Sequence, residues 1–107
     1  MKYRVQFTDT AREDLRALAF HIAEVSGDKE LAKRFVRELQ KSCEILETYP
    51  ESGALPRDRV LKSAGYRFLV YKEYLTFYTV DKERSVVTVL AVFNGRKDYM
   101  RVMKRFL

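Results

Sequence analysis

The chain has 107 residues, of which 47% are hydrophobic and 34% charged, and its 21 Lys and Arg against 15 Asp and Glu give a formal net charge of +6. This length and composition predict one domain, residues 1–107, with a hydrophobic core, and exclude a multi-domain enzyme and a disordered protein. The single Cys excludes a disulfide framework and a multi-cysteine zinc site.

The positive charge is unevenly distributed along the chain. Residues 1–56 hold 9 basic and 10 acidic side chains, whereas residues 57–107 hold 12 basic and 5 acidic ones. A cationic half favours an acidic partner, either the phosphates of a nucleic acid or an acidic protein segment. A cationic surface that serves only solubility is the third alternative, and composition does not choose among the three.

The first predicted elements are a strand and a helix. Residues Lys2–Phe7 alternate polar and apolar side chains, as a half-buried strand does. Residues 10–13 match the S/T-x-x-E capping box, so Thr10 is the expected N-cap and Glu13 its reciprocal partner. Apolar side chains then recur every three or four residues until Ser26-Gly27, which predicts the end of the helix.

A second helix follows at once. Asp28 is its expected N-cap, its apolar face runs from Leu31 to Leu46, and Pro50 prevents continuation beyond Tyr49. Because only a Gly-Asp turn separates the two helices, we expect an antiparallel helical hairpin.

The second half reads as a loop followed by strands. Residues 50–64 contain both prolines and little periodicity, so we expect a loop with a short extended piece near Val60-Leu61. Three runs rich in β-branched and aromatic residues follow, at Tyr66–Tyr71, Leu75–Val80 and Val86–Phe93. Their short connections predict an antiparallel meander, with the helical hairpin packed on one face.

In the basic C-terminal tail, Met100, Met103 and Leu107 fall at helical spacing, which indicates a short amphipathic helix. The predicted fold class is therefore α+β, with an N-terminal strand, an antiparallel helical hairpin, a three-stranded antiparallel meander and a basic C-terminal tail.

Few catalytic or metal sites can be built from this composition. His21 is the one histidine, and a lone His beside the apolar stripe of a helix is usually a surface or packing residue. One Cys and one His cannot form the usual metal sites, and nucleophilic catalysis would need Cys43 to meet His21 across the hairpin. No glycine-rich nucleotide motif occurs, so we expect no cofactor.

Cations and tyrosines on the predicted sheet and tail are the remaining candidates. Together such residues can stack bases, hold phosphates and stabilise the transition state of phosphoryl transfer. Equally, the tyrosines can be half-buried core residues and the cations a docking surface for an acidic protein. The set comprises Arg57, Arg59, Lys62, Arg67, Lys72, Arg96, Lys97 and Arg101, with Tyr66, Tyr71, Tyr74, Tyr78 and Tyr99.

Five short segments carry a family resemblance. They are Ala11-x-x-Asp14-Leu15, Leu46-x-x-Tyr49-Pro50-x-x-Gly53, Gly65-Tyr66-Arg67, Tyr74-x-x-x-Tyr78-x-Val80-Asp81 and Gly95-Arg96-Lys97-Asp98-Tyr99. With these segments in this order, essentially the whole chain resembles the RelE/ParE superfamily of small bacterial toxins from type II toxin–antitoxin modules, also called plasmid stabilisation proteins.

The resemblance implies a toxin that a cognate antitoxin neutralises by wrapping it, with operator DNA bound only through the antitoxin complex. It leaves the target open. RelE-like members are mRNA interferases, ribosome-dependent endoribonucleases in which a 2′-hydroxyl attacks the adjacent phosphate. ParE-like members are not nucleases and poison DNA gyrase. Of the possible targets, we favour growth inhibition by ribosome-dependent mRNA cleavage. Gyrase inhibition and a non-toxic nucleic-acid-binding module are the alternatives, so whether the chain is an enzyme stays open.

Two registers relate the chain to the ribonucleases. The first matches Gly65-Tyr66-Arg67 to their own Gly-Tyr-Arg and makes Arg67 the catalytic arginine, but the hairpin at Lys72-Glu73 becomes an insertion. The second matches Tyr74–Val80 to that strand and keeps the meander intact, but places Leu75 where the arginine is expected. We prefer the second register, in which Arg67 lies on the preceding strand.

Under the cleavage hypothesis, the resemblance implies roles for eight residues. Arg67, Arg96 and Lys97 would hold and neutralise the scissile phosphate, and Tyr99 would stack or transfer a proton. The expected RNA contacts are Arg57, Arg59, Lys62 and Arg101. Under the gyrase hypothesis, the same tail is a protein-docking surface.

The sequence also bears on location. No run of 18 apolar residues occurs, and the start MKYRVQF lacks the apolar core of a signal peptide. We therefore expect a cytoplasmic protein with no membrane partner.

Overall fold

The computed structural model describes residues 2–107, which have an α+β architecture. The sheet in this part of the chain has four strands in the order β1-β4-β3-β2. The strands β2, β3 and β4 form the predicted antiparallel meander, and β1 pairs in parallel with β4. Their bounds are β1 Arg4–Phe7, β2 Arg67–Tyr71, β3 Tyr74–Asp81 and β4 Val86–Asn94.

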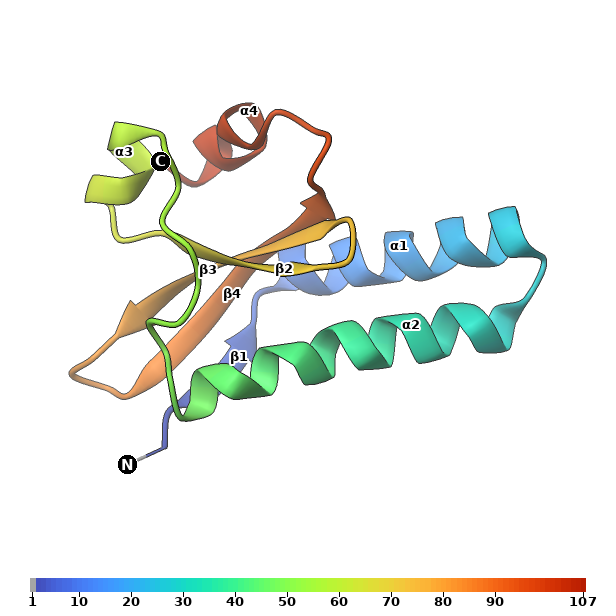
Figure 1. Cartoon of the computed structure of the whole chain (residues 1–107), viewed down its shortest axis with the longest axis horizontal. Coiled ribbons are helices and arrows are strands. Elements are labelled where there is room, and N and C mark those ends of the chain that lie inside the picture. Colours follow the sequence, from blue (N-terminus) through green and yellow to red (C-terminus); the bar gives the residue numbers. More distant parts are fainter. Residues whose placement is uncertain (1) are drawn as a thin grey trace.

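A helical hairpin covers one face of the sheet (Figure 1). It consists of α1 (Asp9–Ser26) and α2 (Lys29–Ser42), and a short 3-10 helix, η1 (Cys43–Glu47), extends α2. Asp28 caps α2 as predicted, because its carboxylate accepts the backbone amides of Glu30 and Leu31. Gly27 ends α1 as predicted, in the left-handed conformation at φ +70°. The far half of the hairpin extends beyond the sheet.

The predicted start of α1 is wrong by two residues. Thr8, not Thr10, is the N-cap, since its Oγ1 accepts the Ala11 amide at 3.1 Å. The same hydroxyl donates to the Leu90 carbonyl at 3.2 Å, which joins the cap to β4. Thr10 lies within the first turn, and the Glu13 carboxylate pairs with Arg16 instead of closing a capping box. A tertiary contact thus selects the cap, and the local sequence does not reveal it.

The predicted loop contains a helix, α3 (Arg59–Ser63), at the place where an extended piece was expected. Asp58 caps it by accepting the Leu61 amide at 2.9 Å. Leu61 is 1% exposed and anchors the helix on the sheet. A single turn with one buried residue has no visible periodicity, which explains why the pattern was missed.

The C-terminal tail forms α4 (Tyr99–Met103) and the 3-10 helix η2 (Lys104–Phe106), as its spacing predicted. Together with α3, it covers the second face of the sheet, opposite the helical hairpin (Figure 1). Met103 is fully buried there, whereas Met100 and Leu107 are exposed. No helix in residues 2–107 has the length and apolar character needed to cross a membrane.

The hydrophobic core has two parts, one on each face of the sheet. Phe77 and Tyr78 are neighbours on β3, both fully buried, and belong to different parts because successive strand residues face opposite sides. Tyr78 packs with Leu15 of α1, Leu39 of α2 and Leu46 of η1. The sheet is therefore covered twice, which accounts for the almost continuous apolar run of β4.

Candidate functional site

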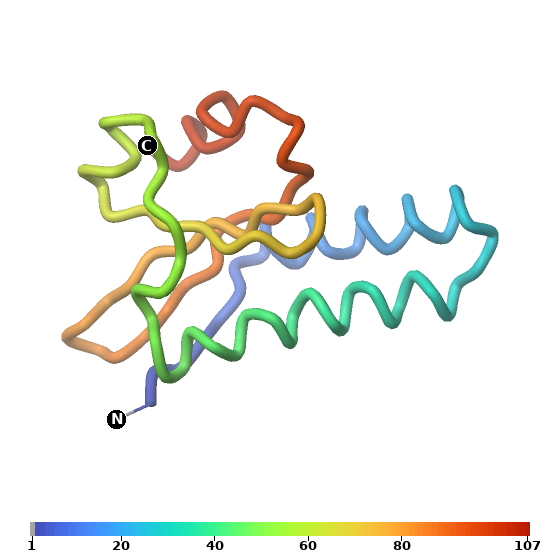
Figure 2. The backbone as a smooth tube through the Cα atoms, viewed as in Figure 1, coloured from blue at the N-terminus to red at the C-terminus, as the bar shows by residue number. Residues whose placement is uncertain are grey.

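The short helices α3 and α4 are far apart in the sequence but lie on the same face of the sheet (Figure 2). The Tyr99 hydroxyl accepts the Arg57 amide at 3.1 Å, and the Tyr66 hydroxyl donates to the Phe106 carbonyl at 3.2 Å. We call residues 55–66 and 94–107 the α3/α4 layer. The four residues predicted to contact RNA all belong to this layer and are exposed: Arg57, Arg59, Lys62 and Arg101.

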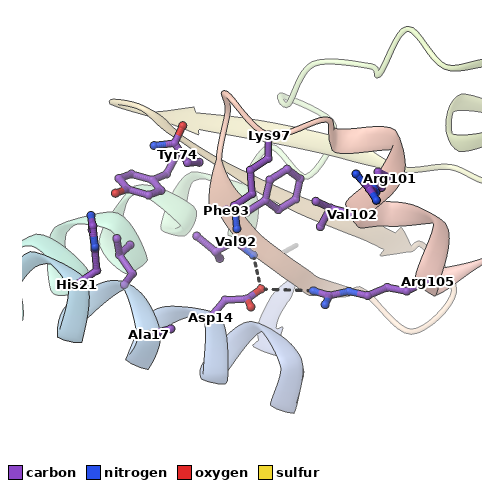
Figure 3. A pocket seen from close by; sticks show the side chains of 12 residues that line it. Asp14, Ala17, His21, Tyr74, Val92, Phe93, Lys97, Arg101, Val102 and Arg105 are labelled. Atoms are coloured by element: carbon purple, nitrogen blue, oxygen red, sulfur yellow. Dashed lines mark hydrogen bonds and ion pairs between the residues drawn. The ribbon is translucent and has the colours of Figure 1, made fainter.

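A pocket of about 500 Å³ opens between α1, the end of β4 and the C-terminal segment (Figure 3). Three cations spaced four residues apart line its C-terminal side, namely Lys97, Arg101 and Arg105. Asp14 and His21 line it from α1 and Tyr74 from β3. The sequence pointed to Lys97 and Arg101 but missed Asp14, His21 and Arg105 as site residues. The four-residue spacing in the tail was a signal that could have found Arg105.

Asp14 joins three elements at the base of this pocket (Figure 3). The pairing of β1 with β4 ends at Val89, so the Val92 amide lies beyond the end of that ladder. Asp14 Oδ2 accepts this amide at 2.9 Å and lies 3.9 Å from Arg105 Nη2. Burial raises the pKa of the Asp14 carboxyl, and the Val92 amide and the charges of Arg105 and Lys97 only partly oppose this rise.

The raised pKa of Asp14 predicts a pH-dependent stability difference. The protonated carboxyl favours folding, so this contribution is fully present below the ordinary pKa of 3.8 and is lost as the pH rises through the folded-state pKa. Asp14→Asn keeps an oxygen for the Val92 amide but cannot ionise. We therefore expect wild type to lose stability relative to Asp14→Asn over this pH range, measured by urea unfolding at several pH values. A difference that is constant with pH would contradict this assignment.

Arg67, a predicted catalytic residue, is engaged in holding a turn. Its Nη1 donates to the carbonyls of Glu51 at 3.1 Å and Gly53 at 3.0 Å, and its Nη2 lies 3.5 Å from Glu51 Oε2. In the strand register Arg67 is opposite Tyr78, so its side chain lies on the helical-hairpin face of the sheet. The side chain is 23% exposed. The guanidinium thus fastens the segment after η1 to β2.

Tyr78 completes this connection from the core. Its ring is fully buried, and its hydroxyl accepts the Gly53 amide at 2.9 Å. Burial raises the pKa of the Tyr78 phenol, although the Gly53 amide and the charge of Arg67 lower it. Two side chains therefore bind the same turn: Arg67 donates to the carbonyls of Glu51 and Gly53, and Tyr78 accepts the Gly53 amide.

Tyr99, the predicted stacking or proton-transfer residue, belongs to the opposite face of the sheet. Its ring centroid lies 5.8 Å from that of Phe77 and 6.4 Å from that of Phe68. Since its hydroxyl accepts the Arg57 amide, the side chain is oriented into the α3/α4 layer and not toward Arg67. The structure does not bring Arg67 and Tyr99 together.

The other two predicted catalytic residues, Arg96 and Lys97, lie together on the loop after β4 and are exposed. The Gly95 amide donates to the Glu73 carbonyl at 2.7 Å, which holds this loop against the β2–β3 hairpin. Leu75 packs nearby, with Cγ 3.5 Å from a Cβ built on Gly95. At the position where the preferred register expects arginine, the structure therefore has a partly buried apolar side chain.

Cys43 and His21 have no shared catalytic geometry. Cys43 is 2% exposed, and burial raises the pKa of its thiol to about 11, so the thiol is neutral at physiological pH. His21 is exposed at the pocket. Within residues 2–107, no group of three His, Cys, Asp or Glu side chains is placed to hold a metal ion.

Comparisons with known proteins agree with this fold. The toxin–antitoxin complex RelBE2 from Mycobacterium tuberculosis is 26% identical, covers 88% of this chain and 99% of its own, and has a TM-score of 0.59. The chromosomal ParDE system from P. aeruginosa is 20% identical, with 87% and 96% covered and a TM-score of 0.72. A mutant E. coli toxin RelE in the free state is 20% identical, with both chains fully covered and a TM-score of 0.67.

The sequence itself matches a family model. Residues 5–99 match the model described as the ParE toxin of the type II toxin–antitoxin system parDE. No curated protein matches the chain. The matched segment runs from the second residue of β1 to the first residue of α4, and so includes the helical hairpin and the sheet except for Arg4. The chain therefore belongs to the ParE toxin family, within the RelE/ParE superfamily.

Proposed function

We propose that this type II toxin stops growth by binding DNA gyrase and that it does not cleave RNA. The proposal reverses the order expected from the sequence, in which mRNA cleavage came first. The observation that carries it is the separation of Arg67 from Tyr99, because catalysis of phosphoryl transfer without a conventional acid–base pair needs its cations and tyrosine around one phosphate.

Arg67 and Tyr99 already make hydrogen bonds within the protein, which supports the same conclusion. Turning the Arg67 guanidinium toward a substrate would release the carbonyls of Glu51 and Gly53, and turning Tyr99 would release the Arg57 amide. Each loss of a hydrogen bond costs about 1 kcal/mol or more. Leu75, at the position where the preferred register expects an arginine, supplies no positive charge. A target bound through a surface needs none of these rearrangements.

The family match supports gyrase as that target. The matching model is that of the ParE toxin, and the resemblance in the sequence associates ParE-like members with gyrase and not with RNA cleavage. We also propose that a cognate antitoxin neutralises the toxin, since the ParDE and RelBE2 relatives are toxin–antitoxin systems. Toxin, antitoxin and target would meet in the cytoplasm.

The test in cells is to induce the toxin without its antitoxin and determine what is damaged first. We expect intact mRNA and an accumulation of covalent gyrase–DNA complexes. Codon-phased cuts in translated mRNA that disappear in Arg96→Ala would reject the proposal in favour of ribosome-dependent cleavage. Normal growth with abundant folded toxin would reject both and favour a non-toxic binding module.

The structural role of Arg67 gives a second, independent check. Arg67→Ala removes three contacts to residues 51–53, so we expect the free energy of unfolding to fall by about 2 kcal/mol. Because Arg67 is not catalytic under this proposal, toxicity per folded molecule should be unchanged at a temperature where the variant is folded. A variant of wild-type stability that has lost toxicity would indicate a catalytic arginine.

A further inference from the structure

The net charge of the protein resides in one layer of the structure. The α3/α4 layer contains 8 basic and 2 acidic side chains, an excess equal to the +6 of the whole chain. The other residues of the chain are balanced, with 13 basic and 13 acidic. Both acids of the layer, Asp58 and Asp98, accept backbone amides as the N-caps of α3 and α4. The charge that the second half of the sequence showed is therefore concentrated on one face.

The cations of this layer are exposed and almost free of ion pairs. Among the described residues, only Arg105 of the eight forms one, at 3.9 Å from Asp14. Two cross-links, from the Arg57 amide to Tyr99 and from Tyr66 to the Phe106 carbonyl, join the two segments that carry these cations. The eight are Arg57, Arg59, Lys62, Arg96, Lys97, Arg101, Lys104 and Arg105.

The tyrosine rings of the layer face the sheet, and the ring of its one phenylalanine, Phe106, is partly buried against the same core, with the Arg105 guanidinium 5.1 Å from its centroid. Tyr66 is 7% exposed, and the Tyr99 ring packs on Phe68 and Phe77. Proteins that bind single-stranded nucleic acid stack its bases on exposed aromatic rings between their cations. In this layer the cations are exposed but the tyrosines are turned toward the core. This arrangement suits the phosphate backbone of a duplex.

We propose that the α3/α4 layer binds the backbone of duplex DNA without reading its sequence. The contacts would be charge-assisted hydrogen bonds from the exposed arginines and lysines to phosphate oxygens, accompanied by counterion release. Binding itself is independent of the proposed function. Its role rests on that function, since DNA contact would direct the toxin to gyrase that already holds DNA. The expectation that operator DNA is bound only through the antitoxin complex concerns a specific sequence and is not changed by this contact.

Fluorescence anisotropy with a labelled duplex of arbitrary sequence tests the proposal on the purified toxin. We expect a dissociation constant of about 1–100 μM at physiological salt and a steep weakening as salt rises. The triple variant Arg57→Ala/Arg59→Ala/Lys62→Ala should bind about tenfold more weakly or worse, and its salt slope should be smaller by about 2–3. The Arg57 backbone amide still reaches Tyr99 in this variant, and circular dichroism checks that it is folded.

A matched control removes the same charge from the other side of the molecule. Arg34→Ala/Arg37→Ala/Lys41→Ala lies on α2, where acids such as Glu38 are interleaved with the cations. We expect this triple variant to bind the duplex within about twofold of wild type, as its removed charges are not at the contact. Equal losses in the two triple variants would overturn the proposal, because binding would then follow net charge alone.

Two competitors decide between DNA and other acidic partners. Poly-glutamate displacing the duplex at equal charge concentration would identify the layer as a surface for acidic protein, and single-stranded RNA binding tenfold more tightly would identify a base-stacking site. Either result overturns the proposal, whereas weak competition by both supports it. Gyrase inhibition by a toxin that binds no duplex would remove this inference alone, and duplex binding without gyrase inhibition would remove only the proposed function.

Discussion

Replacing Gly53 with alanine is expected to lower the free energy of unfolding by about 3 kcal/mol. A Cβ at this position would lie 2.5 Å from Tyr78 Oη and 2.8 Å from the Phe68 carbonyl oxygen, both closer than atoms can approach. Neither neighbour can move freely, since Tyr78 is fully buried and the Phe68 carbonyl accepts the Ala54 amide. Chemical denaturation of wild type and Gly53→Ala measures the effect.

Gly27→Ala is the control for the loss of glycine flexibility. Gly27 has φ +70° with no atom within 4 Å of a built Cβ, so alanine there meets conformational strain but no clash, at about 1 kcal/mol. If Gly53→Ala cost no more than Gly27→Ala, the close packing of the 51–53 turn on Tyr78 would be refuted. The tight turn that Arg67 and Tyr78 bind would then not be part of the fold.

Met103→Ala is expected to cost about 3 kcal/mol, because it removes a fully buried side chain from the core beneath the α3/α4 layer. Met103 belongs to the same cluster as Leu61 of α3 and Phe77 and Phe93 of the sheet. The C-terminal segment should therefore lose its anchor first. Urea unfolding measures the total loss, and hydrogen exchange at residues 99–106 reports whether it begins there.

Met100→Ala provides the matched control for this prediction. Met100 lies one turn earlier on the same helix and is 37% exposed, so its truncation should cost less than about 1 kcal/mol. Similar losses for the two variants, or no accelerated exchange in residues 99–106 of Met103→Ala, would show that the segment is not held by this contact. The cationic surface built on it would then lack its support.

Elements with a strong periodicity were predictable from the sequence. The helical hairpin, its Asp28 cap and the three strands of the meander appear where alternation and helical spacing placed them. The errors arose where a distant contact decides. Thr8 caps α1 because it also reaches Leu90, and α3 exists because Leu61 finds a place on the sheet. No local pattern encodes either contact.

The candidate site was predictable in its residue types but not in its arrangement. The sequence selected Arg67 and Tyr99 as neighbours in one site, yet the β2–β3 register and the two-part core assign them to opposite faces. The engagement of Arg67 depends on a turn 14 residues away in sequence. The hydrogen bond from the Arg57 amide to Tyr99 joins the segments of Arg57 and Arg101 in one layer. Charge counts along the sequence place the positive charge only in the second half of the chain.

A paired assay with purified components decides whether the protein acts on gyrase without RNA chemistry. One reaction contains the toxin, gyrase and relaxed plasmid, and the other contains the toxin, translating ribosomes and mRNA. We predict inhibited supercoiling with gyrase-linked DNA breaks in the first and intact mRNA in the second. Unimpaired supercoiling together with mRNA cut at ribosome-bound codons would show that the toxin acts on RNA and not on gyrase.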